Sequence, residues 1–215
     1  MPSDRPLPGV RAAGVGEGGR DRYYTGDRPD IRELVPAGAR RVLDVGCGAG
    51  ALGEALKAQT GAEVVGIEVF DEAADLAEAR LDRVLRLDLQ TLTELPYPDG
   101  YFDAMTFGDV LEHMHDPHGL LRTLRRYLAG DGTIVCSIPN VKHWSVVFPL
   151  LVRDRFTYAD SGLLDRTHIH FFTLEEIGAM LEETGFEATA LRANCVEPVP
   201  AEVATELVDA VGACL

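Results

Sequence analysis

Val42-Leu43-Asp44-Val45-Gly46-Cys47-Gly48-Ala49-Gly50 is the stretch of sequence that decides the fold. It begins as a short apolar strand and continues into three glycines at alternate positions. Glycine has no Cβ, so peptide N–H groups at the start of the following helix can lie directly against a bound nucleotide. Gly46, Gly48 and Ala51 also satisfy the looser G-x-G-x-x-G/A signature. The stretch predicts a nucleotide-type pocket without choosing between NAD and another adenosine cofactor.

Strand and helix patterns alternate along the chain. Apolar and β-branched runs predict strands at 42–45, 63–67, 83–87, 103–107, 133–138 and near 186–191. Helical periodicity predicts helices at 51–59, 72–81, 117–130, 174–184 and 201–213. Thr173 and Glu176 form a capping box at the start of one of them. Strands and helices that alternate with short connections predict an α/β fold, with a doubly wound, mostly parallel sheet and helices on both faces.

Composition limits the classes of function. The chain has 215 residues, is 46% hydrophobic and carries a net charge of −15. One domain over 21–215 is expected behind a flexible arm at 1–20, and the net charge argues against nucleic acid as a partner. No stretch is long and apolar enough for a membrane span and no signal-peptide core is present, which predicts a cytoplasmic protein. The four scattered cysteines lack ligand spacing, so neither a disulfide framework nor a metal site is expected.

Polar residues follow successive predicted strands. Glu68 ends the second strand, Asp88 ends the third, and Gly108-Asp109 follows the fourth. In open α/β sheets ligands bind beyond the carboxyl ends of the strands, so these residues are expected to share one site. Glu68, in the position of the ribose-binding acid of dinucleotide enzymes, is expected to accept hydrogen bonds from two ribose hydroxyls. Asp88 is then placed to accept one from an adenine amino group.

Residues 141–172 are too long for an ordinary connection and carry many aromatic side chains. We interpret this segment as a lid or acceptor-binding element. Its apolar stretch 144–152, interrupted by Pro149, fits core packing or a dimer face as well as a substrate wall. Tyr23-Tyr24 fits a flap over the cofactor equally as well as surface packing of an N-terminal helix.

Four stretches together resemble the class I S-adenosylmethionine-dependent methyltransferases, in particular the ubiquinone-type branch that acts on small molecules. Val42–Gly50 resembles their first motif, in which an acid precedes G-x-G-x-G as Asp44 does here. Leu95–Asp103 is similar to "lPfpdgsFD", Asp109–His113 to "vleHv", and Gly162–Thr173 to "G-ilD-rtHlrfFT". The resemblance covers roughly Val42 to Phe186. It implies a Rossmann-like sheet of seven strands.

The resemblance also implies how the donor is held. Gly46, Gly48 and Gly50 would contact the methionine moiety and ribose, Glu68 the ribose hydroxyls and Asp88 the adenine. The full expected cofactor set is Asp44, Gly46, Cys47, Gly48, Gly50, Glu68, Val69, Asp88, Leu89, Gly108 and Asp109. The family's seventh strand has no clear counterpart. It lies around 192–196, or the sequence stops short of it, or the C-terminal helix serves association, for example in a homodimer.

Methyl transfer is an in-line displacement, so the protein must align the acceptor and exclude water. Histidine titrates near neutrality, and we expect His168, then His113, to act as the base that deprotonates an O or N acceptor. A purely structural role for either histidine stays open. Arg166 fits either an anionic acceptor or a pair with Asp165. Tyr24, His143, Arg166 and His170 complete the expected substrate-binding set.

The sequence therefore predicts an enzyme that transfers a methyl group from S-adenosylmethionine to O or N of a small molecule and releases S-adenosylhomocysteine. A non-catalytic S-adenosylmethionine-binding module that regulates a partner is the alternative. An NAD-dependent oxidoreductase is less favoured, because a dinucleotide site usually has an apolar residue where Asp44 stands.

Overall fold

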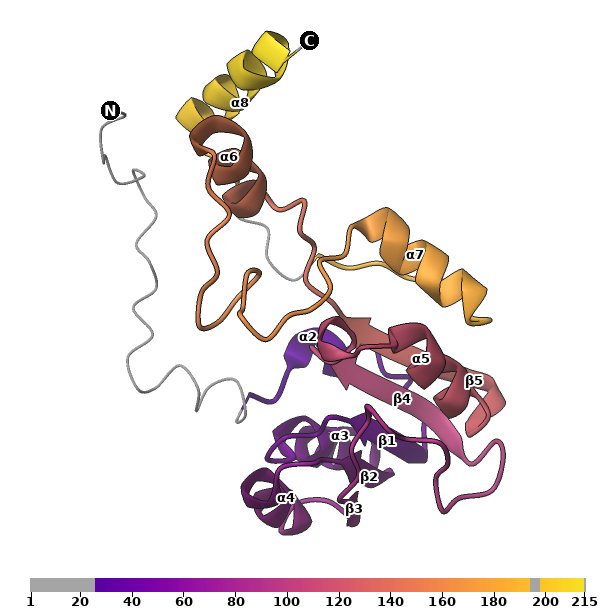
Figure 1. Ribbon diagram of the computed structural model, residues 1–215. Helices are drawn as coiled ribbons and strands as arrows, with labels where there is room; N and C mark the ends of the chain where they lie inside the picture. The colour runs from indigo at the N-terminus through magenta and orange to yellow at the C-terminus, as the bar shows by residue number, and fades with distance from the viewer. Residues whose placement is uncertain (1–25, 194–197, 215) are drawn as a thin grey trace.

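The computed structural model describes residues 26–193 and 198–214, and its centre is one parallel sheet (Figure 1). Five strands lie in the order β3-β2-β1-β4-β5, and every neighbouring pair is parallel. The strands are β1 Arg41–Val45, β2 Glu63–Ile67, β3 Arg83–Leu85, β4 Phe102–Gly108 and β5 Leu128–Ser137. The winding reverses between β1 and β4, so the crevice for a ligand is expected at their carboxyl ends.

Helices bury both faces of the sheet. The helices of the described residues, of which α6 and α8 lie away from the sheet, are α2 Pro29–Arg32, α3 Ala51–Thr60, α4 Asp71–Glu78, the 3-10 helix η1 Leu111–His113, α5 Pro117–Arg125, α6 Trp144–Arg153, α7 Leu174–Glu183 and α8 Ala201–Cys214. One apolar cluster joins Leu43 of β1 to Leu121 of α5 and Met180 of α7. A second joins Val42 of β1 to Leu56 of α3. Successive strand residues point to opposite faces, so β1 is buried between two helix layers.

The capping signals placed the predicted helix ends well. The Thr173 hydroxyl accepts a hydrogen bond from the Glu176 N–H at 3.3 Å, and the Glu176 carboxylate accepts one from the Thr173 N–H at 2.8 Å. Asp116 caps α5 by accepting from the Gly119 N–H at 2.8 Å. Gly185, with φ of 85°, follows the end of α7. These bonds satisfy backbone donors that a helix start leaves unpaired.

The predicted seven-stranded sheet is wrong for the described residues, which form five strands. The sixth strand expected near 186–191 is irregular instead, because only Phe186 packs against the core and residues 187–193 are exposed. Pairing these residues with β5 would bury little apolar surface. Part of the alternative seventh strand, at 194–196, and the arm at 1–20 lie outside the described residues. The C-terminal helix is confirmed as α8.

Several predicted boundaries also shift. Strand β3 ends at Leu85 rather than at residue 87. Helix α5 ends at Arg125, before the predicted Gly130, and β5 already begins at Leu128. The β4–β5 register jumps from Phe102↔Leu128 to Ala104↔Thr133, so the glycines at 130 and 132 lie in a bulge within the strand.

Residues 141–172 leave the sheet after β5 and return to the same place. The Val141 N–H donates to the Phe172 carbonyl oxygen at 2.9 Å, and a bridge joins Asn140 to Phe172. Between these ends, α6 lies beside α8, away from the sheet (Figure 1). Leu150 and Leu151 of α6 are 44% and 50% exposed. Among the described helices, none is long and apolar enough to cross a bilayer.

Gly66 in β2 provides a test of this packing. A Cβ there would lie 2.5 Å from Cys47 Sγ, so Gly66→Ala should lower the free energy of unfolding by about 1–3 kcal/mol. Gly178 in α7 has no heavy atom within 4 Å of the same position, so Gly178→Ala should raise it by up to about 1 kcal/mol. Urea denaturation of both variants measures the difference. Equal stabilities would contradict the close approach of the glycine loop to β2.

Candidate active site

The loops that follow β1, β2 and β4 meet at one edge of the sheet, where the sequence predicted a site. They bring together the glycine loop 46–50 and Glu68, each directly after its strand, and Gly108-Asp109, where β4 ends. Parallel neighbours end at the same edge, which is why residues far apart in sequence converge there.

The glycine loop has a backbone that glycine favours. Gly46, Gly48 and Gly50 have φ of 69°, 53° and 80°. A Cβ on Gly46 would lie 2.8 Å from Val110 Cγ2, so the loop is packed against the β4 turn. The Cys47 N–H donates to the Ile67 carbonyl oxygen at 2.9 Å and holds the loop on β2. Positive φ at these three positions is a conformation that glycine adopts without strain.

Glu68 has a structural task in addition to the predicted one. Its Oε2 accepts from the Gly48 N–H at 2.9 Å, and its Oε1 accepts from the N–H groups of Val69 and Phe70 at 2.9 Å each. An ionised carboxylate offers about four acceptor sites, so three backbone bonds leave room for one ribose hydroxyl. If Glu68 binds both ribose hydroxyls, as predicted, one of its three bonds from backbone N–H groups must break.

Asp44 is a buried acid with one unsatisfied oxygen. The residue is 3% exposed; its Oδ1 accepts from the Thr106 hydroxyl at 2.7 Å, while Oδ2 has no hydrogen-bond partner among the described residues. Burial raises the pKa of Asp44 to about 6, and the bond from Thr106 offsets only part of this effect. A buried, unsatisfied carboxylate oxygen beside the glycine loop fits a ligand that carries an ammonium group.

Asp88 lies in a local turn, and its predicted bond to adenine stays a prediction. It is exposed, and its Oδ1 accepts from the Gln90 N–H at 2.9 Å in a local turn. The cause is that β3 ends at Leu85, so Asp88 comes three residues beyond the strand. Gln90 donates through its amide nitrogen to the His113 carbonyl oxygen at 2.9 Å, so this turn supports η1. Of their neighbours, Val69 is 49% exposed, whereas Leu89 packs against the core.

Arg28 is a site residue that the sequence reasoning missed. Its guanidinium pairs with Asp30 and Asp109, and Nη1 would be 3.4 Å from a Cβ on Gly108. Burial lowers the pKa of Arg28, but the bonds to Asp30 and Asp109 outweigh burial and raise it. The backbone of Asp109, the partner of Arg28, is in the left-handed region, with φ of 57°. Arg28 precedes the first strand without any motif, so only tertiary contact identifies it.

The predicted bases His168 and His113 do come together, with a third group that was not predicted. Their rings make an edge contact with centroids 4.8 Å apart, and His168 Nε2 lies 4.0 Å from Oε1 of Glu112. Glu112 is 1% exposed. Burial raises the pKa of Glu112 to about 8 and lowers the pKa of His168. The signal for Glu112 was its place beside His113 in the stretch 109–113.

The other predicted substrate residues that the structure describes each have a local partner. His143 caps α6, accepting through Nδ1 from the Ser145 N–H at 3.3 Å. Arg166 pairs at the surface with Asp160 at 3.1 Å, not with Asp165 as one expectation had it. His170 stacks on Phe172 with ring centroids 5.5 Å apart. Tyr24 lies outside the described residues.

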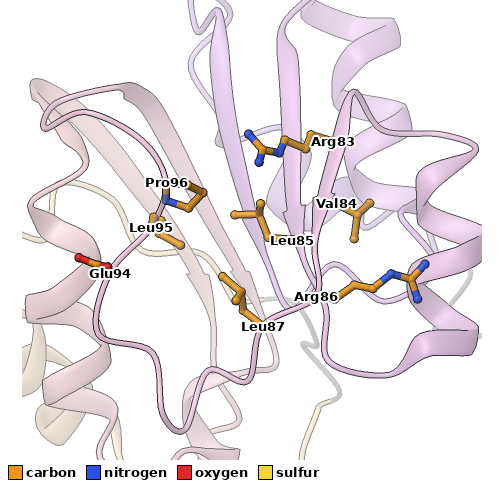
Figure 2. Close-up of a pocket in the computed structure, with 8 residues that line it drawn as sticks. All are labelled: Arg83, Val84, Leu85, Arg86, Leu87, Glu94, Leu95 and Pro96. Carbon is orange, nitrogen blue, oxygen red and sulfur yellow. The ribbon is translucent and has the colours of Figure 1, made fainter.

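A hollow of about 330 Å³ lies elsewhere, along β3. Figure 2 shows Leu85 and Leu87 turned toward Leu95 and Pro96 across it, with Arg86 pointing away. None of the glycine-loop residues, Glu68 or the η1 residues lines it. This hollow is therefore separate from the candidate site.

Comparison with known proteins places this chain in a family. Residues 20–191 match the family model of a methyltransferase domain. The ubiquinone biosynthesis O-methyltransferase of Bordetella avium (strain 197N) is 30% identical over 176 residues, covering 79% of this chain and 71% of that protein. The enzyme of that name from Pseudomonas aeruginosa (strain LESB58) is 33% identical over 168 residues, covering 73% and 68%.

Solved structures share the fold. The S-adenosylmethionine dependent methyltransferase from Mesorhizobium loti superposes with a TM-score of 0.59 at 22% identity, covering 85% of this chain and 91% of that one. A SAM dependent methyltransferase from Aquifex aeolicus gives a TM-score of 0.54 at 20% identity, covering 76% and 81%. At these identities the likeness concerns the fold alone.

Asp44→Asn should separate stability from donor binding. The amide keeps an acceptor for Thr106 and removes a buried charge, so the free protein should gain on the order of 1–3 kcal/mol at pH 7. Loss of the carboxylate should weaken S-adenosylmethionine binding about tenfold or more. Thermal unfolding and calorimetry measure the two effects. The control is Asp71→Asn, whose side chain is 85% exposed; if Asp44→Asn bound the donor as tightly as this control, Asp44 would not be a donor residue.

Asp44 should also shape the pH dependence of stability. Its pKa is raised to about 6 in the folded protein from 3.8, so the folded state binds the proton more tightly. This group should make the free protein lose roughly 2–3 kcal/mol as pH rises from about 4 to 6, with no further change above. Urea denaturation across that range, compared with Asp44→Asn, isolates the slope. An identical slope in the variant would exclude Asp44 as its source.

Proposed function

This chain belongs to the methyltransferase-domain family whose model it matches, and we propose that its acceptor is a ring hydroxyl of a small phenolic or quinol-type molecule. Its activity is S-adenosylmethionine-dependent methyl transfer to a small molecule. The curated relatives are named for O-methylation in ubiquinone biosynthesis, which favours oxygen over nitrogen as the acceptor atom.

The observation that carries the proposal is an aromatic cluster next to the buried polar group. The rings of Phe156 and Phe171 meet edge to face with centroids 5.4 Å apart, and Tyr158 lies 5.7 Å from Phe156. His168 makes an edge contact with Phe171 at 6.4 Å. Phe156 and Tyr158 are 37% and 43% exposed, so their faces are available to an aromatic acceptor.

The polar side chains beside the aromatic cluster suit an acceptor hydroxyl. A phenol has a pKa near 10, so it is a poor nucleophile until its proton leaves. Glu112 and His113 lie on η1, just beyond β4 and the Gly108-Asp109 turn, and the ring of His168 packs against that of His113. We assign the activation of the acceptor oxygen to these three residues.

On the donor side, the residues of the site bind and orient S-adenosylmethionine. Gly46, Gly48 and Gly50 would hold the nucleoside. Glu68 would accept a hydrogen bond from a ribose hydroxyl, Asp44 would stabilise the ammonium group, and Val69 would offer an apolar surface to the base. When bound, S-adenosylmethionine supplies a sulfonium methyl group: the acceptor oxygen's lone pair forms the new O–C bond while the C–S pair stays on sulfur, releasing S-adenosylhomocysteine as a neutral thioether. Alignment of oxygen, methyl carbon and sulfur is then the main contribution of the protein.

Further parts of the proposal concern the surroundings of the site. Residues 141–172 serve as the lid that excludes water from the acceptor, since both ends of this segment are fastened at the end of β5. The net charge of −15 supports a small molecule rather than nucleic acid as partner, and the location proposed is the cytoplasm. The exposed apolar side chains of α6 support a homodimer, which sedimentation would measure.

Methyl transfer to a defined acceptor tests the proposal. The full chain, incubated with S-adenosylmethionine and 3,4-dihydroxybenzoate, should yield S-adenosylhomocysteine and a methyl ether, measured by mass spectrometry. Phe156→Ala should raise KM for the phenol several-fold, because it removes one aromatic face, and leave donor affinity unchanged. Leu191→Ala, at a position 75% exposed, is the matched control. Transfer to amines alone, or donor binding without transfer to any phenol, would refute O-methylation and favour an amine acceptor or a regulatory module.

A further inference from the structure

Gln90 lies in the turn after β3 and binds the end of η1, although the residue itself is exposed. Its Nε2 donates to the His113 carbonyl oxygen at 2.9 Å, and its Oε1 accepts from the His115 N–H at 3.0 Å. Nδ1 of the His115 ring lies 2.9 Å from the same oxygen. Ordering an exposed glutamine side chain costs rotamer entropy, so three bonds to one short segment indicate a specific contact.

The partners of the Gln90 amide fix its orientation. A carbonyl oxygen only accepts a hydrogen bond and a backbone N–H only donates one, so the amide nitrogen must face His113 and the amide oxygen must face the His115 N–H. A carboxylate at position 90 could accept from His115, but it would place a second oxygen against the His113 carbonyl oxygen. The contact as a whole therefore requires an amide.

Helix η1 needs such partners because it is a single turn. A short 3-10 helix leaves its last carbonyl oxygens without partners inside the helix. In η1 the Glu112 carbonyl oxygen accepts from the N–H groups of Ile169 and His170, at 3.0 and 3.1 Å. The His113 carbonyl oxygen accepts from Gln90. Two segments far apart in the sequence thus hold the carbonyl groups of these two η1 residues.

Apolar packing does not by itself orient η1. Leu111 and Met114 are 0% and 8% exposed and belong to the apolar cluster around β1, α5 and α7. The hydrophobic effect is not directional, so this burial holds η1 against the core without setting its rotation. Hydrogen bonds are directional, so the bonds to the carbonyl groups decide which way the side chains of Glu112 and His113 face.

The His113 ring connects η1 to residues 141–172. Its Nδ1 lies 3.1 Å from the Thr167 carbonyl oxygen, and its ring centroid lies 4.8 Å from that of His168. The carbonyl oxygen only accepts, so Nδ1 carries the proton and Nε2 keeps its lone pair when the ring is neutral. A displacement of His113 would break this bond and allow the proton to move to the other ring nitrogen.

We propose that Gln90 is a positioning residue, which holds η1 so that Glu112 and His113 stay beside His168. Its consequence for catalysis rests on the proposed function, in which these three residues activate the acceptor oxygen. Gln90 acts through the His113 backbone and has no assigned contact with donor or acceptor. Its own N–H donates to Asp88 Oδ1 at 2.9 Å, so the turn predicted to bind adenine also supports the acceptor end of the site.

Steady-state kinetics of the full chain with Gln90→Ala test this role. With S-adenosylmethionine and 3,4-dihydroxybenzoate, kcat should fall about 10- to 100-fold, because a displacement on the order of 1 Å in an active site costs rate of this size. The donor affinity and the midpoint of thermal unfolding should remain those of the wild type. The matched control is Gln59→Ala, at an exposed glutamine near the end of α3, which should keep the wild-type kcat.

Gln90→Glu separates the contact with His113 from the contact with His115. The carboxylate still accepts from His115 but cannot donate to the His113 carbonyl oxygen, so this variant should lose as much activity as Gln90→Ala. Wild-type activity in Gln90→Glu would overturn the proposal. So would an unchanged kcat in Gln90→Ala, or a lower kcat that a weaker donor affinity or a lower unfolding midpoint accounts for.

The tautomer of His113 provides a readout that needs neither donor nor acceptor. Long-range proton–nitrogen NMR spectra of the full chain should show the proton on Nδ1 in the wild type and on both ring nitrogens, as a mixture, in Gln90→Ala. If the wild type methylates no phenol, the proposed function fails and this measurement alone decides the role of Gln90. A mixture in the variant then supports positioning, and an unchanged tautomer overturns it, with or without a loss of kcat.

Discussion

Strand β1 pairs in parallel with β2 on one side and with β4 on the other, so the chain that leaves β1 must turn between two neighbouring loops. The glycine loop makes this turn with positive φ at Gly46, Gly48 and Gly50 and lies against Val110 and Ile67. Without that close approach the Glu68 carboxylate could not reach the Gly48 N–H. The donor end of the site depends on this arrangement of backbone.

Two of the buried carboxylates at this edge have oxygen atoms that the described residues leave without a hydrogen bond, one oxygen in Asp44 and both in Glu112. Asp44 lies below the glycine loop and Glu112 lies on η1 beyond β4. In each case burial raises the pKa of the carboxyl group. Such groups reduce the stability of the free protein, and a bound cationic group compensates for them. The donor's ammonium group would serve this purpose at Asp44.

The sequence predictions were accurate where the signal is local. The capping box at Thr173, the second strand at 63–67 and the helix after the glycines all follow from neighbouring residues. They failed where burial decides: residues 186–191 had the pattern of a strand but gain no buried surface beyond Phe186. Strand β3 also ends earlier than predicted, so Asp88 lies in its own turn, and its role toward adenine stays a prediction.

By itself the sequence determined a parallel α/β sheet, a glycine loop at its centre and the class of methyl donor, because these follow from periodicity and from motifs of contiguous residues. Only the tertiary structure decided which side chains share the site. Arg28 reaches Asp109, and His168 reaches Glu112, through contacts between segments far apart in the chain. The physical reason is that burial and long-range hydrogen bonds set these contacts, and neither is encoded in the spacing of residues along the sequence.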